Sequence, residues 1–177
     1  MPTGLALHQW ADIAQFVIAL AAGLALIVAA IELWRRALNA RRDRAYQYSD
    51  RFNQLDVRRM AAEYRKYFED EKHTYEDFMG LDRVRRNELL MLPNLIEEVA
   101  ALYQRKLIDR DVSAEVLGVY VEELWAPSRE FVMEARVKRR RDAFEEWERM
   151  AEDTPVRKAN VDRRMARRRA WRKLLRG

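Results

Sequence analysis

The chain contains the sequence IAQFVIALAAGLALIVAAI at residues 13–31, in which Gln15 is the only polar side chain. At ~1.5 Å per residue, a helix of this length is about 28 Å long, close to the roughly 30 Å hydrocarbon thickness of a bilayer. We therefore expect a transmembrane helix at residues 13–34, preceded by a short extracytoplasmic segment at 1–12. No Pro or Gly interrupts residues 34–79, so the helix can continue beyond the membrane.

Basic residues lie on only one side of this apolar run. Residues 1–34 contain no Lys or Arg, whereas five arginines lie between positions 35 and 44. Because guanidinium groups resist translocation, the sequence predicts a single-pass protein of the cell (inner) membrane, with its N-terminus outside and its C-terminus in the cytoplasm. The predicted membrane-interface residues are the two flanking tryptophans and four of these arginines: Trp10, Trp34, Arg35, Arg36, Arg41 and Arg42. The alternative is a cleaved signal peptide, which the length of the run and the lack of a preceding basic residue disfavour.

Small residues form a ridge along the predicted transmembrane helix. Ala21, Ala25 and Ala29 recur at four-residue spacing. Such a ridge lets two membrane helices approach closely, so it predicts a possible homodimer contact. The alternative is that alanine is simply common in membrane helices.

The composition excludes several kinds of chemistry. Among its 177 residues the chain has no cysteine, two histidines and five glycines. This rules out disulfides, thiolate metal sites and cysteine nucleophiles, and it leaves little material for a histidine metal site or a phosphate-binding glycine loop. We therefore predict that the chain is not an enzyme and holds no cofactor or metal.

Charge divides the remainder of the chain into two parts. Residues 35–154 carry 24 basic and 26 acidic side chains, whereas residues 155–177 carry ten basic side chains and one acidic one. Within the first part, apolar residues recur at helical spacing, as at Tyr48, Phe52 and Leu55, and no stretch has the alternation of a strand. The sequence therefore predicts an all-α protein with a cytoplasmic bundle of about four helices at 35–154. A basic amphipathic helix or tail follows at 155–177.

Cap and break signals predict where the bundle helices begin and end. Thr74 is a candidate N-cap, and either Asp109 or Asp111 can cap a third helix. Pro93 lies inside a helical pattern, where it should kink the helix or begin a new one. Pro127 is expected to close the third helix.

Several residues in the middle of the chain occur in a distinctive order: NLIEEVA at 94–100, KLID at 106–109, then Trp125 and Arg136. This order resembles an uncharacterised bacterial family whose members have one N-terminal membrane helix, a short basic juxtamembrane stretch and a small helical domain. Lys106 stands where such members often carry glycine. The resemblance covers roughly residues 35–152 and implies architecture and location, without an assigned activity.

Four of these polar residues are candidates for one network inside the bundle: Asn94, Glu97, Glu98 and Arg136. Arg136 could form a forked ion pair with the carboxylate of Glu97 or Glu98, and Asn94 could satisfy backbone groups freed near Pro93. Such a network would fix how the helices dock. The alternatives are plain exposed charges, or a ligand or catalytic site.

The basic segment at 155–177 carries the sharpest functional signal. Its candidate binding residues are Arg163, Arg164, Arg167, Arg168, Arg169, Trp171, Arg172 and Lys173. A basic helix with a tryptophan can lie on an anionic membrane surface, and phosphates of nucleic acid are a second possible partner. A disordered tail without a fixed partner is the third alternative.

Together these features predict a membrane-anchored structural or interaction module on the cytoplasmic face, with the lipid bilayer and another protein as its partners. The alternative is a protein that binds nucleic acid or senses anionic lipid through its basic segment, with anionic lipid favoured over nucleic acid. An enzyme or small-molecule sensor is the third hypothesis.

Overall fold

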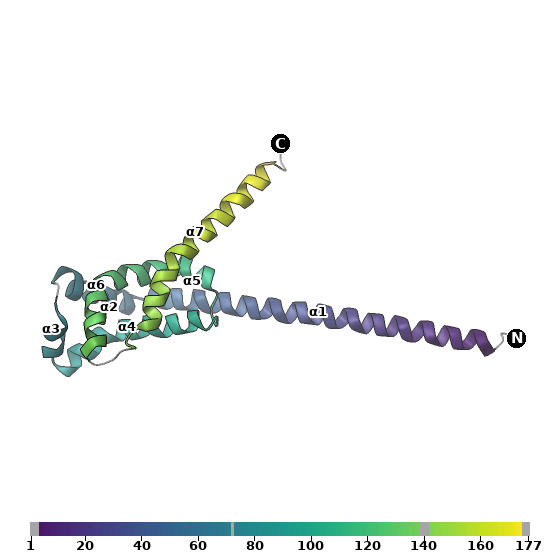
Figure 1. The fold of residues 1–177 in the computed structure, drawn as a ribbon, viewed down its shortest axis with the longest axis horizontal. Helices are drawn as coiled ribbons and strands as arrows, with labels where there is room; N and C mark the ends of the chain where they lie inside the picture. The colour runs from purple at the N-terminus through teal and green to yellow at the C-terminus, as the bar shows by residue number, and fades with distance from the viewer. Residues whose placement is uncertain (1–3, 72, 139–141, 175–177) are drawn as a thin grey trace. The chain divides into compact units, whose positions relative to one another are not determined.

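The computed structural model describes the backbone of residues 4–71, 73–138 and 142–174, and within these it describes side chains at 14–69, 71, 73–138 and 142–170. The described residues are helical and contain no strand, so the all-α prediction is confirmed. In chain order the elements are α1 (Gly4–Phe52), α2 (Leu55–Arg65), the π-helical turn η1 (Lys66–Asp70), α3 (Tyr75–Gly80), α4 (Arg83–Gln104), α5 (Arg110–Val116), α6 (Gly118–Lys138) and α7 (Glu145–Leu174) (Figure 1). The chain divides into two compact units, residues 1–40 and residues 41–177, and each is described separately.

The first unit is helical from Gly4 onward and forms part of α1. The stretch of α1 from Ala14 is long and apolar enough to cross a membrane, and its most apolar window has no residue buried inside the structure. Large side chains such as Phe16 and Leu26 are 70% and 73% exposed. A helix that presents such side chains on every face has the surface of a membrane span.

In the second unit, α7 packs against three of the other helices. It contacts α4, α5 and α6, while α2 packs against α4. Trp147, Met150 and Thr154 of α7 are fully buried, and the first two belong to one apolar cluster with Ile96 and Val99 of α4. Six α-helices follow α1 in the described residues, rather than the expected four or so.

One additional helix, α2, results from a break in the helical backbone at residues 53 and 54. The expected continuation of the membrane helix is observed only as far as Phe52, where α1 ends. The Asn53 amide then donates to the Ser49 carbonyl at 3.0 Å, and Gln54 adopts an extended conformation before α2 begins. Leu55 was expected on the apolar face, but it is 82% exposed because the helix axis changes before it.

None of the three prolines in the described residues ends a helix. Pro93, Pro127 and Pro155 lie inside α4, α6 and α7. The prediction that Pro127 closes a helix is therefore wrong: the break falls earlier, at Leu117 between α5 and α6. A proline removes one helical hydrogen bond, and packing of the rest of the helix can offset that cost. Because α7 continues through Pro155, the expected boundary between bundle and basic segment at residue 155 is not a break in the backbone.

The turn after α4 forms even though Lys106 replaces the glycine of the related motif. Lys106 has φ 58°, in the left-handed region. The Leu107 N–H bonds to the Leu102 carbonyl at 2.9 Å, and the Lys106 N–H bonds to the Tyr103 carbonyl at 3.1 Å. These two bonds form a Schellman motif, which ends α4 and turns the chain toward α5.

The first residue of α6, Gly118, lies in close contact with α7. A Cβ atom on Gly118 would lie 2.6 Å from Cγ2 of Thr154, whose side chain is fully buried and donates to the Met150 carbonyl. The same atom would lie 2.6 Å from Cε of Lys158. Lys158 can move aside, whereas Thr154 cannot, so α6 approaches α7 closely only with glycine at this position.

We expect Gly118→Ala to lower the free energy of unfolding by about 1–3 kcal/mol, because the methyl group overpacks the α6–α7 contact. Gly80→Ala is the matched control, since a Cβ on Gly80 meets nothing within 4 Å. Thermal unfolding of the full chain in neutral-lipid nanodiscs, followed by circular dichroism, measures both. Equal midpoints for the two variants would contradict this account of the helix contact.

Candidate functional site

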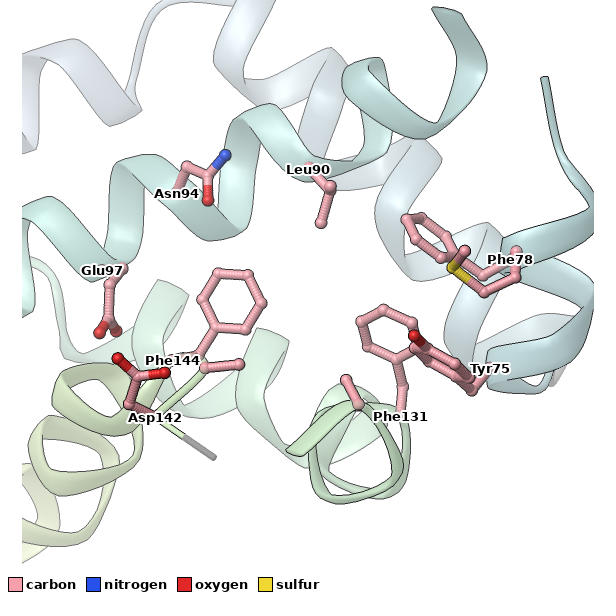
Figure 2. A pocket seen from close by; sticks show the side chains of 11 residues that line it. Tyr75, Phe78, Leu90, Asn94, Glu97, Phe131, Asp142 and Phe144 are labelled. Carbon is pink, nitrogen blue, oxygen red and sulfur yellow. The ribbon is translucent and has the colours of Figure 1, made fainter. Parts of the chain in front are cut away.

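A pocket of about 450 Å³ opens where α3, α4, α6 and the segment before α7 meet (Figure 2). Its apolar lining is aromatic at one end, and its polar lining gathers at the other. The lining residues are Tyr75, Phe78, Met79, Leu90, Asn94, Glu97, Phe131, Ala135, Asp142, Ala143 and Phe144.

The aromatic end is positioned by the short helix α3. Thr74 caps this helix as expected: its hydroxyl accepts from the Asp77 N–H, and the Asp77 carboxylate accepts from the Thr74 N–H. These hydrogen bonds hold the pKa of the Asp77 carboxyl below its usual value. The cap orients Tyr75 and Phe78 against Phe131 of α6, with ring centroids 5.8 and 4.9 Å apart.

Phe144 forms the middle of the wall and has an unusual backbone. Its φ is 54°, a left-handed value that is rare for a bulky residue. The ring lines the pocket and also packs edge-on against Trp147, with centroids 6.0 Å apart. A strained residue of this kind persists only where its surroundings hold it, and such residues concentrate at functional sites.

Glu97 occupies the polar end and caps a different helix. Its carboxylate accepts from the backbone N–H groups of Glu146 at 3.2 Å and Trp147 at 2.8 Å, which lie in the first turn of α7. Phe144 precedes this helix and has no side-chain oxygen to cap it, so Glu97 of α4 supplies the acceptor. Burial raises the pKa of the Glu97 carboxyl, although the two N–H donors oppose that shift.

Arg136 lies beside the same helix end, but its partner differs from the expected one. Its Nη1 lies 2.5 Å from Glu148 Oε2, and its Nε donates to the Ala143 carbonyl at 2.8 Å. The Nη2 atom is buried and has no partner among the described residues. The expected ion pair with Glu97 or Glu98 is not among the contacts of the described residues, because Glu148 on α7 takes that place.

The remaining two members of the predicted network lie apart. The Glu98 carboxylate accepts from the Tyr48 hydroxyl at 2.9 Å, and it does not line the pocket. Asn94 is exposed and lines the pocket near Glu97. The structure therefore brings Asn94, Glu97 and Arg136 to the α4–α6–α7 junction and places Glu98 against the end of α1.

Sequence reasoning missed the rest of the pocket. Tyr75, Phe78 and Phe131 could be anticipated only as core residues, and Asp142 carried no signal. Phe144 immediately precedes a helix with three glutamates in its first turn, Glu145, Glu146 and Glu148. This acidic first turn marks a helix N-terminus and could have indicated where α7 begins.

The predicted basic-segment residues fall into three groups along α7. Arg164 lies 2.7 Å from Asp111 of α5, and Arg163 bonds to Asn160 within α7. Arg167, Arg168 and Arg169 are exposed. The side chains of Trp171, Arg172 and Lys173 lie outside the described residues.

Two basic residues of this segment that were not singled out bind the bundle. Arg157 contacts both Asp111 and Asp153, at 3.4 and 2.5 Å, and Lys158 lies 3.2 Å from Glu122. Hydrogen bonds from Tyr103 and Arg157 lower the pKa of the Asp153 carboxyl, although burial alone would raise it. The charge excess of residues 155–177 is therefore partly compensated by acidic residues of α5, α6 and α7.

The predicted interface residues are divided between the two units. In the first unit Trp34 is 67% exposed, Arg35 is exposed, and Arg36 lies 3.3 Å from Glu32. In the second unit Arg42 lies 3.2 Å from Asp109, and the Arg41 carbonyl accepts from the Asp109 N–H. The Trp10 side chain lies outside the described residues.

The alanine ridge that was predicted as a possible homodimer contact lies on α1. Ala21, Ala25 and Ala29 are exposed on α1. The carboxylates and histidines of the described residues form no cluster of three or more that could hold a metal ion.

These features define an all-α protein with one candidate membrane-spanning helix. A family model described as "Domain of unknown function (DUF4760)" matches residues 19–154, and the chain belongs to that family. The predicted family resemblance is thus confirmed, and the match begins inside the apolar run rather than near residue 35. No curated protein and no solved structure matches the chain.

We expect Glu97→Ala to lower the free energy of unfolding by about 1–3 kcal/mol, because two N–H groups at the start of α7 lose their acceptor. Glu98→Ala removes only the bond from Tyr48, so its cost should stay below about 1 kcal/mol. Unfolding midpoints of the two neighbouring variants provide the measurement. A larger loss for Glu98→Ala would show that the cap does not stabilise the bundle.

Proposed function

We propose that the chain is a single-pass membrane-anchored interaction module, whose helical unit at residues 41–177 binds another protein at the cytoplasmic face of the cell (inner) membrane. The observation that carries this proposal is the exposed apolar helix from Ala14 onward, followed directly by arginines. Lipid accounts for an apolar surface that no other part of the described structure covers. The arginines favour retention of the second unit in the cytoplasm.

The polar groups of the second unit support a scaffold rather than a reaction centre. Three partly buried carboxylates have structural partners: Glu97 caps α7, Asp109 caps α5, and Asp153 accepts from Tyr103 and Arg157. Carboxylates that are hydrogen-bonded in this way fix the positions of the helices. This supports an interaction role, in which a partner would bind the outer surface of the helices.

The chain has no cysteine, so single introduced cysteines report topology without background. We expect Thr3→Cys to react with a membrane-impermeant maleimide on intact cells, and Ala159→Cys to react only after permeabilisation. The intact mass of the membrane-extracted protein distinguishes an anchor from a cleaved signal sequence. Labelling of Ala159→Cys on intact cells, release by alkaline carbonate, or loss of the N-terminal segment would each overturn the anchoring proposal.

A second experiment tests for a protein partner by affinity capture of the full chain from a detergent extract. A protein that is captured by wild type, but lost when the surface of the second unit is altered, identifies the partner. If every captured protein binds through the apolar helix alone, the helical unit at residues 41–177 does not act as an interaction module.

A second candidate role concerns the outer end of α7. Arg157, Lys158 and Arg164 already contact acidic residues of the bundle, whereas Arg167 to Arg169 are exposed. We propose that these exposed arginines bind anionic lipid headgroups. A chain anchored in the bilayer keeps its basic residues at high local concentration near such headgroups.

We expect a fluorophore on Ala170→Cys to be quenched by bromolipids in phosphatidylserine nanodiscs, and the quenching to disappear at high salt. Replacing Arg167, Arg168 and Arg169 by Gln should shift the docking equilibrium by about 100-fold, at about 1 kcal/mol for each charge. The control variant replaces the exposed Arg59, Arg105 and Arg129 by Gln, which removes the same charge elsewhere. Equal effects of the two variants would refute lipid binding by α7, and salt-dependent capture of RNA by wild type alone would favour the nucleic-acid alternative.

A further inference from the structure

The pocket at the α3–α4–α6–α7 junction has two chemically different ends. Figure 2 shows Tyr75, Phe78 and Phe131 at one end, and Asn94, Glu97 and Asp142 at the other. Its volume of about 450 Å³ falls in the range of roughly 300–1,000 Å³ that small-molecule sites occupy. An apolar wall facing a few convergent oxygen atoms is the usual construction of such sites.

We propose that this pocket binds a small amine, with its apolar body against the aromatic end and its protonated nitrogen at the carboxylates of Glu97 and Asp142. The proposal goes beyond an interaction role and does not depend on it.

The oxygen atoms at the polar end can accept more donors than they now receive. Each Glu97 oxygen accepts one backbone N–H, and a carboxylate oxygen can accept two hydrogen bonds. Asp142 is exposed and adds a second carboxylate, and Asn94 adds an amide oxygen. A protonated amine has up to three N–H donors, which matches these three acceptors.

The two cations near the end of α6, Arg136 and Lys138, form their ion pairs with carboxylates that do not line the pocket. Arg136 binds Glu148 and the Ala143 carbonyl. Lys138 binds Glu134 and Glu76, and these partners raise the pKa of its amine to about 12. Glu97 meets the positive end of the α7 dipole, and Asp142 adds a second carboxylate to the lining of the pocket.

Electrostatics inside the pocket also favour a cation. Burial raises the pKa of the Glu97 carboxyl, which means that its negative charge is poorly solvated there. A bound ammonium group would offset that cost. One lining ring already has a cation over its face: the Lys138 amine lies 5.3 Å from the centroid of the Tyr75 ring.

The test uses the full chain in neutral-lipid nanodiscs and three probes with one skeleton: phenylbutylamine, phenylbutanol and phenylbutanoate. Equilibrium dialysis against empty nanodiscs corrects for partition into lipid. We expect the amine to bind about ten-fold more tightly than the carboxylate, with the alcohol between them, because two carboxylates attract one head group and repel the other. Equal affinity for all three probes, or no binding of the amine, would overturn the proposal.

Two variants assign the binding to this pocket. Asp142→Asn should weaken amine binding by about three- to five-fold and leave alcohol binding unchanged, as expected for loss of one partly solvated ion pair. Asp50→Asn makes the same chemical change on an exposed residue of α1 and should have no effect. If the two variants weaken the amine equally, the binding does not involve the polar end.

Ala135→Phe places a ring inside the pocket and should abolish binding of all three probes. Because this variant could also disturb packing, its circular dichroism and unfolding midpoint are measured alongside. A folded Ala135→Phe variant that still binds the amine would show that the site lies elsewhere.

Discussion

The second unit depends on one hydrogen-bonded contact, between the Glu97 carboxylate and the first turn of α7. This turn lies against the core: Trp147 is fully buried, and its indole N–H donates to the Val121 carbonyl of α6 at 3.1 Å. A helix N-terminus in such a place must find acceptors for its free N–H groups. The residue before α7 is Phe144, whose side chain has no acceptor, so the side-chain acceptor for this turn comes from Glu97 of α4. The cap therefore joins α4 to α7 and fixes where α7 begins.

A second polar contact fixes the same helix pair two turns further along α7. The Tyr103 hydroxyl of α4 donates to Asp153 at 2.6 Å, and Arg157 binds the same carboxylate. Between these two contacts lie the buried apolar residues Met150 and Ala151. Apolar packing drives α7 against α4, but it tolerates sliding by a turn. The carboxylates at each end specify one register.

Much of this arrangement was readable from the sequence because it depends on local signals. The apolar run at 13–31, the cap at Thr74, and the polar residues Glu97 and Arg136 were identifiable from residue type and spacing, whereas the cap of α5 was narrowed only to Asp109 or Asp111. Family membership was readable for the same reason, since its motif is a fixed order of residues.

What could not be read depends on contacts between distant segments. Pro127 signals a helix end locally, yet α6 continues through it because its flanking residues, Leu124 and Phe131 among them, are buried. Arg136 was expected to pair with α4, but a glutamate twelve residues later in the chain is closer once the chain turns at Phe144. The pocket itself combines four segments, none of which carries a signal for it alone.

The continuity of α7 through Pro155 has a consequence for any molecule that binds its basic end. The arginines at 167–169 extend a helix whose first turns are already anchored in the core, so their backbone is ordered before a partner arrives. A flexible arm would lose roughly 1–2 kcal/mol of conformational freedom for each residue that it ordered on binding. Here the backbone of these arginines is already helical, so contact with a charged surface would not have to order it.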